Sequence, residues 1–175
     1  EVRNAFLAAV LGIDLGEIVE SRILPSHLRQ KDKDDKLGIL DVRVLLNNKE
    51  QIDIEIQVTS SEYWAERTLF YLGKMFVDQL KPGEDYQKLE KCIHVGILNF
   101  TLFDDEEYYS RFHFWSDQGR KMYSDKYEIH TLELPKLAKH EYPETELLKW
   151  LQFINAETKE EFEMAAEKSE YIKKA

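Results

Sequence analysis

The chain has 175 residues, of which 43% are hydrophobic and 12% aromatic, and its formal net charge at pH 7 is −10. This length suits one domain with its own hydrophobic core, and the composition excludes a disordered chain. The negative charge excludes a general electrostatic attraction to nucleic acid. A DNA-binding protein of this composition therefore needs a local basic patch or bound cations.

The hydrophobic periodicity predicts helices and strands in alternation. In chain order they are a helix (2–11), a short strand (17–24), two strands (39–46 and 51–58), a long helix ending near 80, three strands (91–103, 111–115 and 126–134) and two helices (within 143–172). Asn47-Asn48-Lys49 predicts a hairpin turn, because Asn tolerates positive φ. Thr59-Ser60-Ser61 offers N-caps for the long helix. This order predicts an α/β domain with a sheet core.

The chain shows neither an internal repeat nor a domain linker, so we expect a single domain over residues 1–175 with an acidic, helical end over about 143–175. Because the chain starts without Met and within a helical pattern, we expect its natural N-terminus to lie upstream of Glu1. No apolar run approaches the roughly 18 residues of a membrane span. The single Cys92 lies in an apolar run and is expected to be a buried thiol, which suits a cytoplasmic protein without membrane contact.

Two carboxylates oppose each other on the polar face of the predicted hairpin. In the expected register Asp41 faces Glu55, and directly opposed residues have Cβ atoms about 4.5–5.5 Å apart. Opposed like charges destabilise a sheet, but a divalent cation reverses that effect, because carboxylate oxygens are natural ligands of Mg²⁺ or Mn²⁺. Gln57 lies one step further along the same face, about 6–7 Å from Glu55. The hairpin therefore predicts a metal site.

The same pattern also fits an ordinary hairpin with one apolar and one polar face. In that interpretation Arg43 opposite Asp53 is a surface ion pair worth less than about 1 kcal/mol. The spacing alone leaves both interpretations open, since a single Asp…Glu-x-Gln motif occurs often by chance. The five histidines have no metal-binding spacing, so a histidine metal site is not expected.

Four separated motifs then give the chain a resemblance to a known family. They are Gly38-Ile-Leu-Asp41-Val-Arg-Val with Ile54-Glu55-Ile56-Gln57, Glu66-Arg67-Thr-Leu-Phe-Tyr71-Leu-Gly-Lys-Met, Leu80-Lys-Pro-Gly83-Glu-Asp-Tyr86 and Ile97-Leu-Asn-Phe100. In this order they resemble the PD-(D/E)XK nuclease superfamily, in particular its Rpn-like recombination-promoting nucleases and transposases of bacteria. The resemblance extends from about residue 5 to about residue 155.

The resemblance implies a restriction-endonuclease-like fold, with a mixed sheet flanked by helices, and a DNA endonuclease that depends on Mg²⁺ or Mn²⁺. The family's acids fall on Asp41 and Glu55 and its third signature position on Gln57, which makes these the implied catalytic residues. The implied metal ligands are Asp41, Glu55 and the carbonyl of Ile56. The proline of the family name is Leu40 here.

Gln57 replaces the lysine of the family name, carries no charge and cannot act as a base. Rpn-like proteins also have Gln at this position, so the replacement does not by itself mean inactivity. The general base therefore stays unassigned. The acid that related nucleases carry on their first helix is either Glu17 or a residue upstream of Glu1.

The long helix after the hairpin presents two stripes at helical spacing. The first is expected to face the core and contains Ala65, Leu69, Leu72, Phe76 and Leu80. The second contains Tyr63, Arg67, Tyr71 and Lys74. Either its long side chains merely cover the core, or Arg67 and Lys74 contact DNA phosphates while Tyr71 stacks or forms hydrogen bonds.

Two functions therefore remain: a metal-dependent DNA endonuclease of the transposase or recombination-promoting type, and a degenerate nuclease fold that binds DNA or protein. The opposed acids Asp41 and Glu55 favour the enzyme. The missing lysine and the acidic charge favour the binding module. DNA is the expected partner in the first case, and a homodimer is left open.

Overall fold

The computed structural model describes residues 1–28 and 40–175 of the chain, so the charged loop expected at 30–36 and the start of the strand expected from residue 39 lie outside the described residues. The helices are α1 (Val2–Leu11), α2 (Trp64–Val77), α3 (Glu146–Ile154) and α4 (Lys159–Glu167). The strands are β1 (Ser21–Leu24), β2 (Val42–Leu46), β3 (Glu50–Gln57), β4 (Cys92–Leu98), β5 (Tyr109–Trp115) and β6 (Met122–Glu133). The short 3₁₀ turns are η1 (Leu15–Glu17), η2 (Tyr86–Lys88), η3 (Leu134–Lys136) and η4 (Ile172–Lys174).

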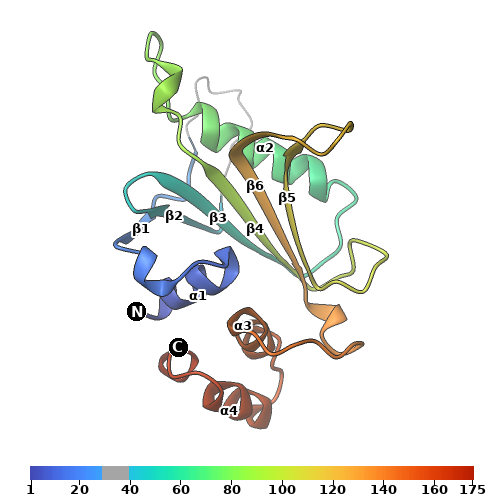
Figure 1. Ribbon diagram of the computed structural model, residues 1–175. Coiled ribbons are helices and arrows are strands. Elements are labelled where there is room, and N and C mark those ends of the chain that lie inside the picture. Colours follow the sequence, from blue (N-terminus) through green and yellow to red (C-terminus); the bar gives the residue numbers. More distant parts are fainter. Residues whose placement is uncertain (29–39) are drawn as a thin grey trace.

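The strands of the described residues form one mixed sheet in the order β1-β2-β3-β4-β6-β5 (Figure 1). Strands β3, β4 and β6 are parallel, and the remaining neighbours pair antiparallel. The carboxyl ends of the three parallel strands therefore meet at one edge of the sheet. This arrangement confirms the expected α/β class with a restriction-endonuclease-like core.

The β2–β3 hairpin has the predicted register, with Arg43 opposite Asp53. Its turn contains two Asn residues in the left-handed region, Asn47 at φ 49° and Asn48 at φ 58°. Asn adopts this conformation more readily than most residues, which explains the site of the turn. The turn chemistry and the alternating pattern together fix which side chains of β3 share a face.

Helices cover both faces of the sheet. Helices α1, α3 and α4 lie on one face and α2 on the other (Figure 1). The first face contributes Val44, Ile52 and Val95 to the main core with α1 and α3. Beneath α2, Leu72 and Met75 pack against Cys92. The hairpin face that carries Asp53 and Glu55 is therefore covered by a helix over much of its length.

Helix α2 is rotated relative to the prediction. Its buried residues are Trp64, Thr68, Leu72 and Met75, whereas Ala65 and Leu69 of the expected core stripe are exposed, so that stripe was wrong except for the fully buried Leu72 and the partly buried Phe76 and Leu80. The helix also begins at Trp64 with Tyr63 as its N-cap, several residues after the expected caps.

Close contact between α2 and β4 explains this rotation. Trp64 is 2% exposed, and its ring lies over Gly96 so closely that a Cβ on Gly96 would lie 2.6 Å from the ring atom Cζ2. Only glycine leaves room for the indole, so Trp64 points into the sheet. This orientation turns Thr68 and Leu72 inward as well, since they lie one and two turns along the same face.

Burial also decides the state of the single cysteine. Cys92 is 0% exposed, and its Sγ accepts a hydrogen bond from Nε2 of Gln79 at 3.1 Å. Burial raises the pKa of the thiol to about 12. The expected buried, structural Cys92 is thus confirmed. Among the described residues no helix combines the length and apolar character needed to cross a membrane.

The contact between Gly96 and Trp64 generates the first prediction. Gly96→Ala should lower the free energy of unfolding by about 1–3 kcal/mol, because the new methyl group overpacks the site. The matched control is Gly73→Ala in α2, where no atom lies within 4 Å of the added Cβ and the helix propensity of Ala should stabilise by about 0.5–1 kcal/mol. Denaturant unfolding of both variants measures the effect, and equal stabilisation by the two substitutions would contradict it.

Candidate active site

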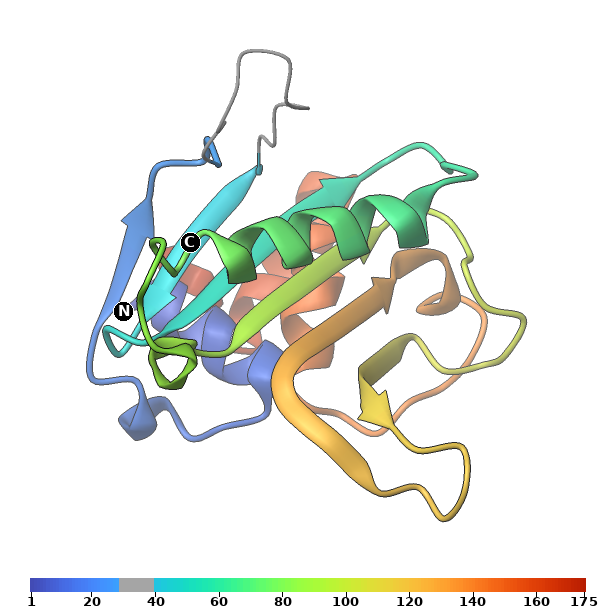
Figure 2. The ribbon, with the colours of Figure 1, turned by 90° about the horizontal axis from the view of Figure 1, so that it is seen from above.

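The candidate site lies where β3 approaches its carboxyl end beneath the first turns of α2 (Figure 2). Glu55 of β3 is 3% exposed and is its central carboxylate. Asp53, two residues earlier, and His94 of β4 are 0% exposed, and one ligand atom from each of these three side chains lies within 4.8 Å of the others. The sheet and α2 therefore enclose two carboxylates and one imidazole.

Arg67 of α2 forms an ion pair with the Oε1 atom of Glu55. That oxygen nevertheless accepts no hydrogen bond of good geometry. Burial raises the pKa of Glu55, the charges of Arg67 and His94 oppose this shift, and the nearby acids Asp53 and Asp41 add to it. A buried acid with a raised pKa is a suitable place for a further positive charge.

Asp41 is exposed and lies directly before β2. Its Oδ2 accepts a hydrogen bond from the backbone N–H of Ile56 at 3.3 Å. The carboxylate of Asp41 therefore lies against the backbone of β3 immediately after Glu55. The structure thus brings Asp41, Glu55 and Ile56 to one place, and Asp41 is the exposed member of this group.

Gln57 lies at the end of β3, and both the nitrogen and the oxygen of its side-chain amide form hydrogen bonds. Its Nε2 donates to the backbone oxygen of Thr59 at 2.8 Å, and its Oε1 accepts from Nη1 of Arg67 at 3.5 Å. The guanidinium of Arg67 therefore contacts the first and third residues of the Glu55-Ile56-Gln57 motif. Arg67, which the sequence places on the second stripe of the helix, contacts side chains of β3.

Asp53 and His94 form a buried pair that the sequence reasoning missed. Nδ1 of His94 lies 2.8 Å from Oδ2 of Asp53, and its Nε2 lies 3.4 Å from Oγ1 of Thr68. The surface ion pair of Asp53 with Arg43, which the ordinary-hairpin interpretation contains, is wrong, because Asp53 is buried under α2 and Arg43 donates instead to Oε1 of Gln51.

No local signal in the sequence could have identified His94. It reaches Asp53 through the parallel pairing of β3 with β4, between residues that are 41 positions apart. Spacing rules for histidine ligands read only residues that are close along the chain.

The two other residues expected to contact nucleic acid lie further along α2. The ring of Tyr71 is 5.5 Å from the guanidinium carbon of Arg67, and Tyr71 packs partly into the core beneath the helix. Nζ of Lys74 lies 5.9 Å from the ring centroid of Phe70. Arg67, Tyr71 and Lys74 thus form a row leading away from Glu55, with Arg67 at its inner end.

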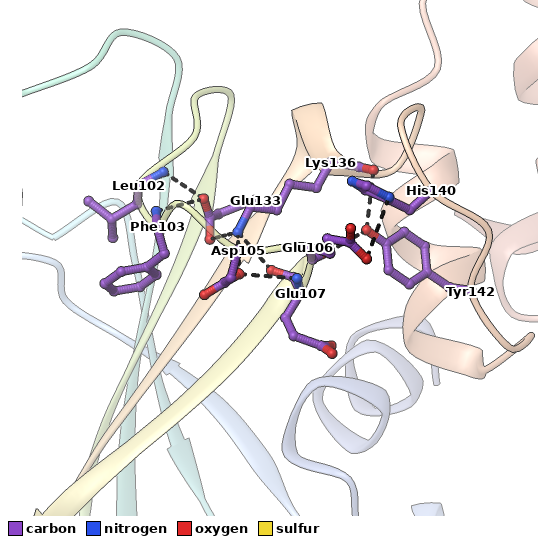
Figure 3. Close-up of polar contacts among 9 residues, drawn as sticks. All are labelled: Leu102, Phe103, Asp105, Glu106, Glu107, Glu133, Lys136, His140 and Tyr142. Atoms are coloured by element: carbon purple, nitrogen blue, oxygen red, sulfur yellow. Dashed lines mark hydrogen bonds and ion pairs between the residues drawn. The ribbon is translucent and has the colours of Figure 1, made fainter.

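A second ionic network lies at the same edge of the sheet, at the end of β6 (Figure 3). Glu133 is 1% exposed and accepts the backbone N–H groups of Leu102 and Phe103 at 2.5 and 3.2 Å. Lys136 is 2% exposed and donates to Glu133 at 2.9 Å, to Asp105 at 2.7 Å and to a backbone carbonyl at 3.0 Å. This network fastens the segment after β4 to β6 and gives the edge a rigid frame.

The position of Glu17 argues against the role considered for it. Its side chain accepts the N–H of Asp14 at 2.9 Å, and its backbone oxygen accepts from Nδ2 of Asn47 at 3.0 Å. Asn47 forms the β2–β3 turn, so Glu17 lies at the opposite end of β3 from Glu55. Glu17 is therefore not the first-helix acid of this site.

Comparison with known proteins agrees with this arrangement. The family model described as PD-(D/E)XK nuclease family transposase matches residues 1–175. Neither the curated proteins nor the solved structures gave a match. Since the family model covers the whole chain, the protein belongs to the PD-(D/E)XK nuclease family of transposases.

Proposed function

We propose that the protein is a divalent-metal-dependent DNA endonuclease of the transposase or recombination-promoting type. One observation carries the proposal: Glu55 is a buried carboxylate, and the exposed carboxylate of Asp41 accepts the backbone N–H of Ile56, the next residue of the same strand. Membership of a nuclease family makes DNA the expected substrate.

The residues present fit a Mg²⁺ or Mn²⁺ ion. Asp41 and Glu55 offer carboxylate oxygens and Ile56 a backbone carbonyl, and hard divalent cations prefer oxygen ligands. Burial raises the pKa of Glu55, and a bound cation would favour its ionised form. Asp41 is exposed, which gives an ion a path from solvent.

The chemistry assigned to these residues is phosphodiester hydrolysis. A bound divalent cation supplies an acidified water and Lewis-acid stabilisation of the phosphoryl oxygens. Asp41 and Glu55 would hold the ion through their carboxylate oxygens. Gln57, fixed through its Nε2 to Thr59, uses its amide to orient the attacking water or a phosphate oxygen.

The charge distribution favours an approach of DNA along α2. The β6 side of the edge carries an exposed acidic run at residues 104–107, which repels phosphate. On the other side Arg67 and Lys74 lie on α2 beside Tyr71, so phosphate contacts by the two cations and stacking or hydrogen bonding by Tyr71 suit this face. The cation at Glu55 would reduce the repulsion that the net charge of −10 imposes.

One observation favours a second function. Arg67 already neutralises Glu55, and Gln57 brings no charge of its own. Such a site is also compatible with a degenerate nuclease fold that binds DNA or another protein without cutting. Cleavage assays of variants in which Asp41 or Glu55 is replaced distinguish the nuclease from the binding module.

Asp41→Ala and Glu55→Ala should each abolish the nicking of supercoiled DNA in Mg²⁺ or Mn²⁺, because each removes a ligand of the ion. The exposed Asp125→Ala on β6 is the matched control and should nick at the parent rate. Agarose-gel assays with and without EDTA measure the rates. Parent-like cutting by either acid variant would show that the ligand assignment is wrong.

Gln57→Lys should keep or raise the cleavage rate, because lysine has a similar reach and adds a positive charge beside the phosphate. Gln57→Ala should lower the rate by about 10–1000-fold, as expected for one lost transition-state hydrogen bond. Single-turnover cleavage of a labelled duplex gives both rates. If the parent and Gln57→Lys are both inert in either metal, the binding-module function replaces the enzyme function.

A further inference from the structure

We infer that Arg67 supplies, at the scissile phosphate, the positive charge that Gln57 cannot provide. The inference rests on the proposed nuclease function and assigns Arg67 a role in the reaction beyond a general DNA contact. It starts from a mismatch on β3, where the motif places an uncharged amide beside a carboxylate that is 3% exposed.

The position of the guanidinium is the first argument. From α2, its Nη2 contacts Glu55 and its Nη1 lies 3.5 Å from Oε1 of Gln57. A lysine at position 57 would extend its ammonium group from the carboxyl end of β3, where Gln57 lies. The charge of Arg67 therefore occupies the space beside the motif from a different element of the fold.

The unused hydrogen-bonding capacity of Arg67 is the second argument. Its Nε is buried and has no hydrogen-bond partner, although a guanidinium offers five N–H donors. The side chain as a whole is 39% exposed, so part of it reaches solvent. A planar, partly unsatisfied guanidinium is suited to bidentate contact with a phosphate.

The surroundings hold Arg67 in place for this role. Tyr71 lies one turn further along α2, with its ring 5.5 Å from the guanidinium carbon. Trp64, one turn before Arg67 on the buried face, fixes the start of the helix over Gly96. Without an ion the guanidinium balances the charge of Glu55. With a cation bound at Glu55, Arg67 would no longer be needed for this balance and could contact the phosphate.

The chemistry limits Arg67 to stabilising charge. Hydrolysis forms one P–O bond from water and breaks one P–O bond to the deoxyribose. The proton of the attacking water passes to solvent, and the departing oxygen receives a proton from solvent. A guanidinium stays protonated in proteins, so Arg67 neither gives nor takes a proton.

Charge replacement tests this role directly. Arg67→Gln should lower the single-turnover cleavage rate by about 100-fold or more while the parent cuts, in line with the loss of a transition-state charge contact. Adding Gln57→Lys to Arg67→Gln should restore the rate to within about tenfold of the parent, and Arg67→Lys should retain most of it. The exposed Lys121→Gln is the matched control for loss of one positive charge and should cut like the parent.

Measuring Mn²⁺ binding in the absence of DNA distinguishes a role of Arg67 at the phosphate from a role in holding the metal ligands in place. Calorimetric titration with Mn²⁺ should show that Arg67→Gln binds the ion at least as tightly as the parent, because the competing cation on Glu55 is gone. Weaker ion binding by Arg67→Gln would overturn the inference, since it would make Arg67 a support of the ligands.

The remaining outcomes are also decisive. If the parent cuts DNA and Arg67→Gln cuts at a rate within about threefold of the parent rate, the role of Arg67 is overturned and the nuclease function stands. Loss of cutting that neither Gln57→Lys nor Arg67→Lys corrects shows that positive charge is not what Arg67 supplies. A parent that is inert in both metals overturns the nuclease function and this inference together.

Discussion

The burial of the Glu55 carboxylate beneath α2 is the constraint on which the rest of the site depends. A buried charge is costly unless it is paired, and Glu55 has Arg67 as its ion-pair partner in the described structure. Burial still raises the pKa of Glu55. Arg67 therefore offsets the burial of Glu55 only in part, and a bound cation would add further positive charge beside the carboxylate.

The sheet and its frame make this arrangement possible. Glycine at position 96 admits Trp64, which sets the rotation of α2 and so aims Arg67 at β3. At the neighbouring edge, Glu133 and Lys136 tie the segment after β4 to β6. Rigid elements on both sides hold the ends of the strands, which a reaction centre requires if its groups are to keep their geometry.

Local sequence signals predicted the hairpin well. The alternation and the Asn pair fixed the register of β2 with β3 and so brought Asp41 near Glu55. The rotation of α2 and the pair of Asp53 with His94 were missed, because both depend on the parallel packing of β4 against β3. A helical stripe read from hydrophobicity alone could not include Thr68, which is buried beside His94.

The central claim is that a divalent cation binds between Asp41 and Glu55. Anomalous diffraction from crystals of the protein soaked with Mn²⁺ tests it most directly. The account predicts a peak about 2.0–2.6 Å from carboxylate oxygens of both residues. A peak held instead by Asp53 and His94, or no peak near β3 at saturating Mn²⁺, would contradict it.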